Sequence, residues 1–247
     1  MKNLITFFTC FLCFYTCLAQ ETVERKNTLI DDVFERYQAR VDSLGNETRV
    51  GNYLVLAHRK TVVKGQYTNG ERTGVWYFYD HAGKAMQQYD FDKNHLLFEA
   101  PEQEPSNFRY LMDQVITPKD ITTQPIKIGG RYFGYLPYLQ LARKIHALRG
   151  ISDDGCMAVL TLLVSPLGRL ADLRVQLSCS VNNQQIDYPI NIDSLPNSEK
   201  TFIPATLNGE KTACRITILC KSDDHGELTI VEPGESILRT GPSFLLK

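Results

Sequence analysis

The sequence lacks the short motifs that mark most hydrolases, metalloenzymes and nucleotide-binding proteins. Its 247 residues contain no HExxH, no GxSxG, no P-loop and no dinucleotide-binding fingerprint, and no two of its five histidines have the spacing of metal ligands. The most polar cluster, Asp223-Asp224-His225, follows an apolar run and precedes a glycine, which is typical of a solvated turn. We therefore expect no catalytic residue, no metal site and no cofactor.

An excess of one charge is also missing. The formal net charge is −1, so no field attracts the whole chain to nucleic acid or to an anionic membrane. Hydrophobic residues make up 43% of the chain and charged residues 22%, which is typical of a folded protein with one large domain or two modest ones.

No apolar run reaches the roughly 20 residues needed to span a bilayer. The run Leu4–Ala19 follows a lysine and ends in small residues, as a secretory signal peptide does. We expect residues 1–19 to be cleaved, the mature chain to begin at Gln20, and the protein to be periplasmic or associated with the cell envelope. The alternatives are a membrane anchor formed by residues 4–19 and, less favoured, a lipoprotein acylated at Cys17.

Closely spaced cysteine pairs are absent from the mature chain as well. Three of the seven cysteines lie in the expected signal peptide, which leaves Cys156, Cys179, Cys214 and Cys220. Four cysteines in an exported chain are compatible with disulfides and allow three pairings. Because none has CxxC or CxxH spacing, a zinc site is not expected.

Residues 27–45 have an apolar spacing close to that of a helix. Asn27 can cap the start and Gly45 the end. The apolar positions between them are Leu29, Ile30, Val33, Phe34, Tyr37, Val41 and Leu44. The sequence predicts an amphipathic helix here, with its apolar stripe docked on the domain that follows.

A repeat comes next. Arg49–Tyr53 (RVGNY) recurs 23 residues later as Arg72–Trp76 (RTGVW). Asn69-Gly70 is a strong hairpin signal because both residues tolerate a positive φ. A repeat of this length predicts stacked β-hairpins that share one core.

The pattern formed by Gly74, Trp76, Tyr79 and Gly83 resembles the MORN-like repeats of bacterial exported proteins over about residues 49–98. In that family each repeat is a β-hairpin, and aromatic side chains stack between hairpins. The resemblance implies that all four residues are structural, with Trp76 in the core and not at a ligand.

The second half has a different pattern. Residues 99–128 begin with proline and acidic residues and are expected to be a linker, with a short helix at 106–116. Beyond residue 129 the periodicity predicts one helix, ended by Gly150, then strands at 156–164 and 170–179, a short helical or irregular crossover at 187–199, and a last strand ending at Cys220.

This order resembles the C-terminal domain of TonB-type energy-coupling proteins over about residues 129–222. The matching features are Gly129-Gly130, Gly155, Gly168 and the run Phe202-x-Pro204-Ala205-x-x-Asn208-Gly209-x-Lys211. The resemblance implies that an extended segment of a partner adds to the sheet beside the last strand, near Arg215, Thr217 and Leu219. A proline at Thr217 would then abolish binding. The N-terminal segment lacks the serine and histidine with which TonB couples to its motor inside the membrane, and no long spacer rich in proline and lysine follows it.

Together these features predict an α+β protein. The expected parts are a signal peptide (1–19), a helix with a MORN-like β-repeat domain (20–98), a linker (99–128), a TonB C-terminal-like domain (129–222) and a C-terminal extension (223–247).

Hairpin geometry favours one cysteine pairing. With Pro166–Arg169 as a four-residue loop, Leu160 faces Val175 on the apolar face, as burial requires. The same register sets Cys156 opposite Cys179, at a Cα separation within disulfide reach.

Cys214 and Cys220 lie on one strand, about 20 Å apart, and cannot pair with each other. They are therefore expected to be buried thiols. A bridge from either hairpin cysteine to the last strand, or a bulge that breaks the register, remains the alternative.

Two classes of function remain open. The favoured one is an exported, non-enzymatic envelope protein that binds other proteins and no nucleic acid. The alternative is an exported hydrolase whose site lies in the cleft between the two domains. Two carboxylates, or a Cys–His pair, within about 4 Å there would support the alternative.

Overall fold

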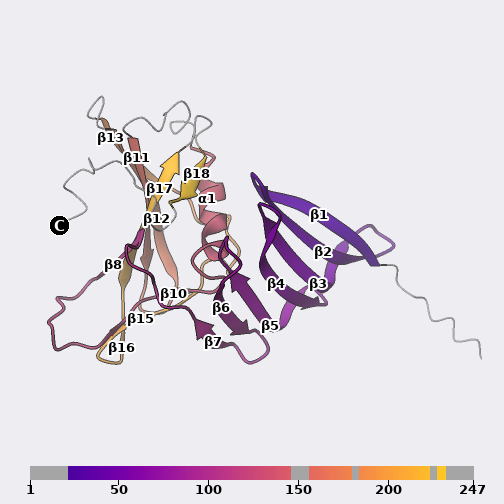
Figure 1. Ribbon diagram of the computed structural model, residues 1–247, viewed down its shortest axis with the longest axis horizontal. Helices are drawn as coiled ribbons and strands as arrows, with labels where there is room; N and C mark the ends of the chain where they lie inside the picture. The colour runs from indigo at the N-terminus through magenta and orange to yellow at the C-terminus, as the bar shows by residue number, and fades with distance from the viewer. Residues whose placement is uncertain (1–21, 146–155, 180–183, 223–226, 232–247) are drawn as a thin grey trace, which may run out of the picture.

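The computed structural model describes residues 22–145, 156–179, 184–222 and 227–231, and consists mainly of antiparallel strands (Figure 1). The described residues contain one short α-helix, so the chain is sheet-rich and is α+β only in the broad sense that a helix packs on antiparallel sheet. The expected signal peptide, the Gly150 and Gly155 positions, the turn at 223–225 and the extension beyond residue 231 lie outside the described residues.

The first sheet has seven strands that follow one another in sequence order. They are β1 (Thr22–Ile30), β2 (Val33–Val41), β3 (Glu47–Ala57), β4 (Lys60–Thr68), β5 (Glu71–Tyr79), β6 (Ala85–Asp90) and β7 (His95–Glu99). Asn69 and Gly70 have φ angles of 51° and 87° in the turn between β4 and β5. The hairpins predicted for the repeat region are therefore confirmed.

The helix predicted over residues 27–45 is wrong, because this segment forms the last four residues of β1 and all of β2. On β2 the buried side chains alternate with exposed ones, beginning with Val33, Glu35 and Tyr37. That period of two is the strand signal. The sequence does not show this period as an alternation of apolar and polar residues. The buried Glu35 is charged, and the apolar Phe34 lies on the other face.

The second sheet has the strand order β13-β12-β11-β17-β18, and β8 also pairs with β17. Its strands are β8 (Phe108–Met112), β11 (Cys156–Val164), β12 (Leu170–Cys179), β13 (Gln184–Pro189), β17 (Cys214–Ser222) and β18 (Leu228–Ile230). Two small sheets adjoin it, made of β9 (Thr122–Thr123), β10 (Ile126–Lys127), β14 (Phe202–Ile203), β15 (Ala205–Leu207) and β16 (Glu210–Thr212).

Residues 99–128 do more than link the two halves. They contain β8, which is a member of the second sheet, together with β9 and β10. The short helix predicted at 106–116 is wrong, since Phe108–Met112 is β8. This strand pairs with β17 about a hundred residues further along, a partner that no local pattern reveals.

The hairpin of β11 and β12 has the predicted register. Leu160 faces Val175 and Leu162 faces Leu173. The loop is one residue shorter than expected, because the Ser165 amide already bonds to the carbonyl of Arg169. A bulge beside Val164 compensates, so the pairing further along the strands is unchanged.

The helix α1 (Leu136–Ala142) follows a 3₁₀ turn (Phe133–Tyr135) and is shorter than predicted. It lies between the two sheets in Figure 1 and contacts β1 and β18. One continuous apolar core joins the layers and includes Trp76 of the first sheet, Tyr138 of the helix and Leu160 of the second sheet.

Candidate functional site

Trp76 is fully buried on β5, as predicted for a core residue. Its ring centroid lies 5.1 Å from that of Tyr53 and 5.3 Å from that of Tyr67. The indole N–H donates to two backbone carbonyls of its own sheet, at 3.2 and 3.3 Å. Gly65 leaves the space for the ring, because a Cβ there would lie 2.2 Å from it. The tryptophan therefore has no face open to a ligand.

The glycines of the repeat mark bends in the backbone. Gly51 and Gly74 occupy the same position of the two repeat copies and have φ angles of 65° and 67°. Gly83, in the turn after β5, has a φ of 87°. These angles favour glycine, so the glycines are structural. Tyr79, at the end of β5, pairs with Ala85.

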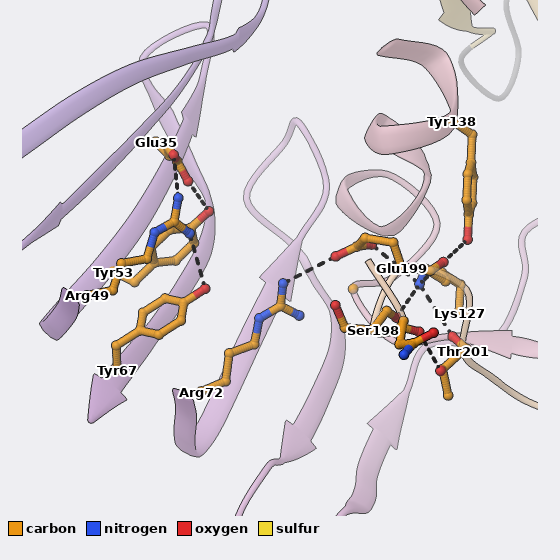
Figure 2. A network of polar contacts seen from close by, with 12 residues as sticks. Glu35, Arg49, Tyr53, Tyr67, Arg72, Lys127, Tyr138, Ser198, Glu199 and Thr201 are labelled. Carbon is orange, nitrogen blue, oxygen red and sulfur yellow. Dashed lines mark hydrogen bonds and ion pairs between the residues drawn. The ribbon is translucent and has the colours of Figure 1, made fainter. Parts of the chain in front are cut away.

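The arginines that open the two repeat copies each lie over an aromatic ring and each form an ion pair, and Figure 2 shows the two ion pairs. Each guanidinium lies over an aromatic ring, at 4.4 Å from the ring centroid for Arg49 and 5.1 Å for Arg72. Arg49 pairs with the buried Glu35 of its own sheet at 2.8 Å. Arg72 pairs with Glu199 at 3.4 Å, and Glu199 belongs to the second half of the chain. One motif thus makes an internal ion pair in the first copy and a contact between the two halves in the second.

Glu199 also faces Lys127 of β10, whose side chain is 1% exposed. The Lys127 ammonium donates to the backbone carbonyls of Ser198, Glu199 and Thr201, at 2.9 to 3.3 Å (Figure 2). Burial lowers the pKa of Lys127 to about 8, and the carboxylate of Glu199 opposes part of that shift. Because all three ammonium protons have acceptors, this lysine fixes the segment 198–201 in place.

A polar cleft lies between the first sheet and the segment that follows it. The amide of Gln87 donates to Glu99 at 2.6 Å, and its oxygen accepts from the backbone N–H groups of Gly129 and Gly130 at 2.7 and 3.1 Å. Arg131 donates to the same Glu99 carboxylate at 3.3 Å. Burial raises the pKa of Glu99, against the opposing effect of Gln87 and Arg131.

Glu102 is a second carboxylate in this cleft. It accepts a hydrogen bond from the Ser106 hydroxyl, and Tyr110 interacts with it as well. Burial raises the pKa of Glu102 and of Tyr110. Adjoining cavities of about 270 and 360 Å³ share Glu102 and Arg131 in their walls.

The cleft therefore holds two carboxylates, and both are already hydrogen-bonded to other side chains. The Ser106 hydroxyl accepts from the Phe108 N–H at 3.0 Å while it donates to Glu102, so it closes its own turn. Within the described ranges no group of three or more histidine, cysteine, aspartate or glutamate side chains could hold a metal ion. The arrangement fits a structural junction better than an activated nucleophile.

The expected open edge at β17 does not exist. Its residues pair with β11 on one side and with β8 and β18 on the other, so Arg215 faces Leu111 and Thr217 faces Arg109 of β8. The Leu219 amide bonds to the carbonyl of Asn107. Backbone strand addition beside these three residues is therefore excluded. The Thr217→Pro substitution no longer tests partner binding, because it would disrupt pairing within the sheet.

An open edge lies instead at β7, which pairs only with β6 among the described strands. A bulge at Leu97 breaks the alternation of side chains. Leu97 and Phe98 are both exposed as a result, at 47% and 41%. The opposite edge, β1, carries Glu24, Arg25 and Lys26 in succession, the kind of charged sequence that keeps an edge from pairing.

The cysteine register is confirmed at the level of the backbone, since Cys156 lies directly opposite Cys179. The disulfide itself remains a prediction. Cys214 and Cys220 are buried free thiols, as expected. Burial raises the pKa of Cys214 to about 11 and that of Cys220 to about 12, which keeps both thiols protonated and unreactive near neutral pH.

Comparison with protein-family models, curated proteins and solved structures found no significant match. In the part of the chain that the structure describes, no helix is both long and apolar enough to cross a membrane.

Sequence reasoning missed the charged residues that join the two halves. The arginine at the head of each repeat copy was a usable signal, because a charge repeated inside a β-repeat suggests a repeated partner. Lys127 and Glu199 gave no such signal. They meet across 72 residues of sequence, and neither stands in a recognisable motif.

Proposed function

We propose that the protein is exported through a cleaved signal peptide and is a non-enzymatic component of the cell envelope that binds other proteins. In this proposal the first half is a MORN-like repeat sheet and the second half a TonB C-terminal-like domain without an energy-coupling anchor. The observation that carries the proposal is the open edge at β7, with two large apolar side chains exposed on it.

Strand addition then takes place at β7 and not at the last strand. An extended segment of a partner would pair with the unpaired backbone groups of residues 95–99, and its apolar side chains would cover Leu97 and Phe98. The bulge would contribute to specificity. It exposes two neighbouring side chains on one face, so a partner segment must have a shape that fits both.

The test is crosslinking followed by affinity purification from envelope fractions. The double substitution Leu97→Asp with Phe98→Asp should abolish the crosslinked partner, because it places two charges in the contact. Leu44→Asp is the matched control, since Leu44 is 86% exposed in the turn after β2, away from this edge. The proposal fails if the β7 variant folds and still captures the partner as well as the Leu44 variant does.

An exported hydrolase is the second candidate, and the pair of Ser106 and Glu102 beside a cavity is the observation that favours it. In that case Ser106 would be labelled by a fluorophosphonate, and Ser106→Ala would lose both the label and any esterase activity. Absence of labelling in the folded wild-type protein would remove this candidate.

A further inference from the structure

The face of the second sheet that points away from α1 is lined by alternate residues of β8, β11, β12 and β17. These residues surround a depression of about 530 Å³, and they include Arg109, Leu111, Asp172, Arg174, Arg215 and Thr217. The opposite face carries the fully buried residues Leu160, Leu173 and Ile216 of the core. The sheet is thus packed on one side and hollowed by this depression on the other, where Val159 is nevertheless buried.

Charge is unevenly distributed over the face with the depression. At the β12 end, Arg174 donates to both oxygens of Asp187 at 2.8 to 3.2 Å and lies 3.8 Å from Asp172, so one cation neutralises two carboxylates. At the β8 end, Arg109 and Arg215 add positive charge, and the strands there contribute no carboxylate to the depression. Arg109 also interacts electrostatically with Glu102, which lies outside the depression, so Arg215 is the less neutralised of the two. The face is therefore positive on the side of β8 and β17, although the whole chain has a net charge of −1.

Arg215 is the most available cation. It is exposed on β17, directly opposite Leu111 of β8, which is 55% exposed. Arg109 lies two pairs further along, opposite Thr217, and its guanidinium donates to the carbonyl of Ser106 at 3.1 Å. A guanidinium next to an exposed leucine forms a small mixed surface, suited to a carboxylate beside an apolar side chain.

The spacing of these residues favours an extended occupant. Along β17, Arg215, Thr217 and Leu219 project from the same face, two residues apart, which is about 7 Å. An extended peptide presents its own alternate side chains at the same interval, whereas a helix does not.

We propose that this face binds an extended acidic segment of another protein, with carboxylates on Arg215 and Arg109 and an apolar side chain on Leu111. The contact uses side chains and not the backbone edge. Arg215, Thr217 and Leu219 thereby keep the partner-binding role expected from the sequence, by a different mode. This surface is separate from the β7 edge and does not depend on it.

The probe is a short fluorescent peptide that alternates glutamate with leucine, and its matched counterpart has lysine in place of glutamate. Binding to the full mature chain is measured by fluorescence anisotropy at low and at physiological salt. We expect the glutamate peptide to bind, more weakly at the higher salt, and the lysine peptide not to bind. Arg215→Glu should weaken binding at least about tenfold, and Leu111→Asp should weaken it as well.

Lys64→Glu is the matched control, because it makes the same change of charge at an exposed position on the first sheet. It should leave the affinity unchanged, and the thermal transition of each variant shows that it is folded. Equal binding of both peptides overturns the proposal, as does an equal loss for the Lys64 and Arg215 variants. Arg215-dependent binding to phosphatidylglycerol vesicles without peptide binding would overturn it in favour of a lipid surface.

The β7 variant separates this inference from the proposed function. Leu97→Asp with Phe98→Asp should not change the affinity for the acidic peptide, and Arg215→Glu should not remove the partner captured through β7. Loss of peptide binding in the β7 variant would contradict the assignment of the peptide to the second sheet.

Discussion

At the scale of single residues, the tightest constraint is the fit between Trp76 and Gly65. The indole occupies the space where any other residue at position 65 would place its Cβ, so each of the two positions fixes the other. Neighbouring aromatic rings at 5.1 to 5.4 Å complete the packing around it.

Trp76→Ala should therefore lower the free energy of unfolding by about 3 to 5 kcal/mol, because it leaves a cavity in the middle of the first sheet. Urea denaturation monitored by circular dichroism measures this. Phe98→Ala is the control: its side chain is exposed, and it should change stability by less than about 0.5 kcal/mol. A melting transition unchanged in the Trp76 variant would contradict the packing role.

The lowered pKa of the buried Lys127 predicts that the stability of the fold depends on pH. Its pKa is about 8 in the folded chain and 10.5 when exposed, so burial of the charged form costs free energy at any pH below 8. Between pH 8 and 10.5 the folded chain releases this proton while the unfolded chain keeps it. The free energy of unfolding should therefore gain a rising contribution in that window, at most roughly 3 kcal/mol.

Denaturant titrations at pH 7.5 and 9.5 test this, with Lys127→Met as the comparison. The contribution should be present in the wild-type chain and missing from the variant, whatever the variant's own stability. The same pH dependence in both proteins would show that Lys127 is not its source.

At the scale of elements, the sequence predicted hairpins well where turn chemistry and alternation agree. Asn69-Gly70 located one turn, and the alternation of β11 and β12 gave the correct register although the loop was one residue too long. Prediction failed at β2, where the charged Glu35 is buried because it pairs with Arg49 of β3. It also failed at β8, whose pairing strand is remote in sequence. Both failures come from tertiary contacts, which local periodicity does not encode.

The confirmed register gives the disulfide prediction a direct test. Peptide mapping of the oxidised protein without reductant should yield a Cys156 peptide linked to a Cys179 peptide. Reduction should destabilise the second sheet, since the bridge would close the end of a hairpin. A link from Cys156 to Cys214 or Cys220, or no link at all, contradicts the prediction.

At the scale of the whole molecule, the two sheets are joined by a common apolar core and by the polar contacts around Lys127 and Glu199. Neither half buries its apolar face alone, because α1 packs between them. The two halves should therefore behave as one cooperative unit.

Scanning calorimetry of the mature chain should show a single transition. Arg72→Gln should move this transition to lower temperature without splitting it, because the ion pair with Glu199 is one of many contacts across the junction. Two separate transitions in the wild-type chain would mean that the halves are independent domains.

The two repeat arginines also differ in how they would respond to the insertion of another repeat copy. Arg49 pairs with Glu35 of the same sheet, whereas Arg72 pairs with Glu199 of the second half of the chain. A third repeat copy inserted after β5 would move the second half away and leave Arg72 without its counter-ion. Tandem duplication, the ordinary route by which repeat arrays lengthen, would therefore remove this contact between the two halves if it took place at this point.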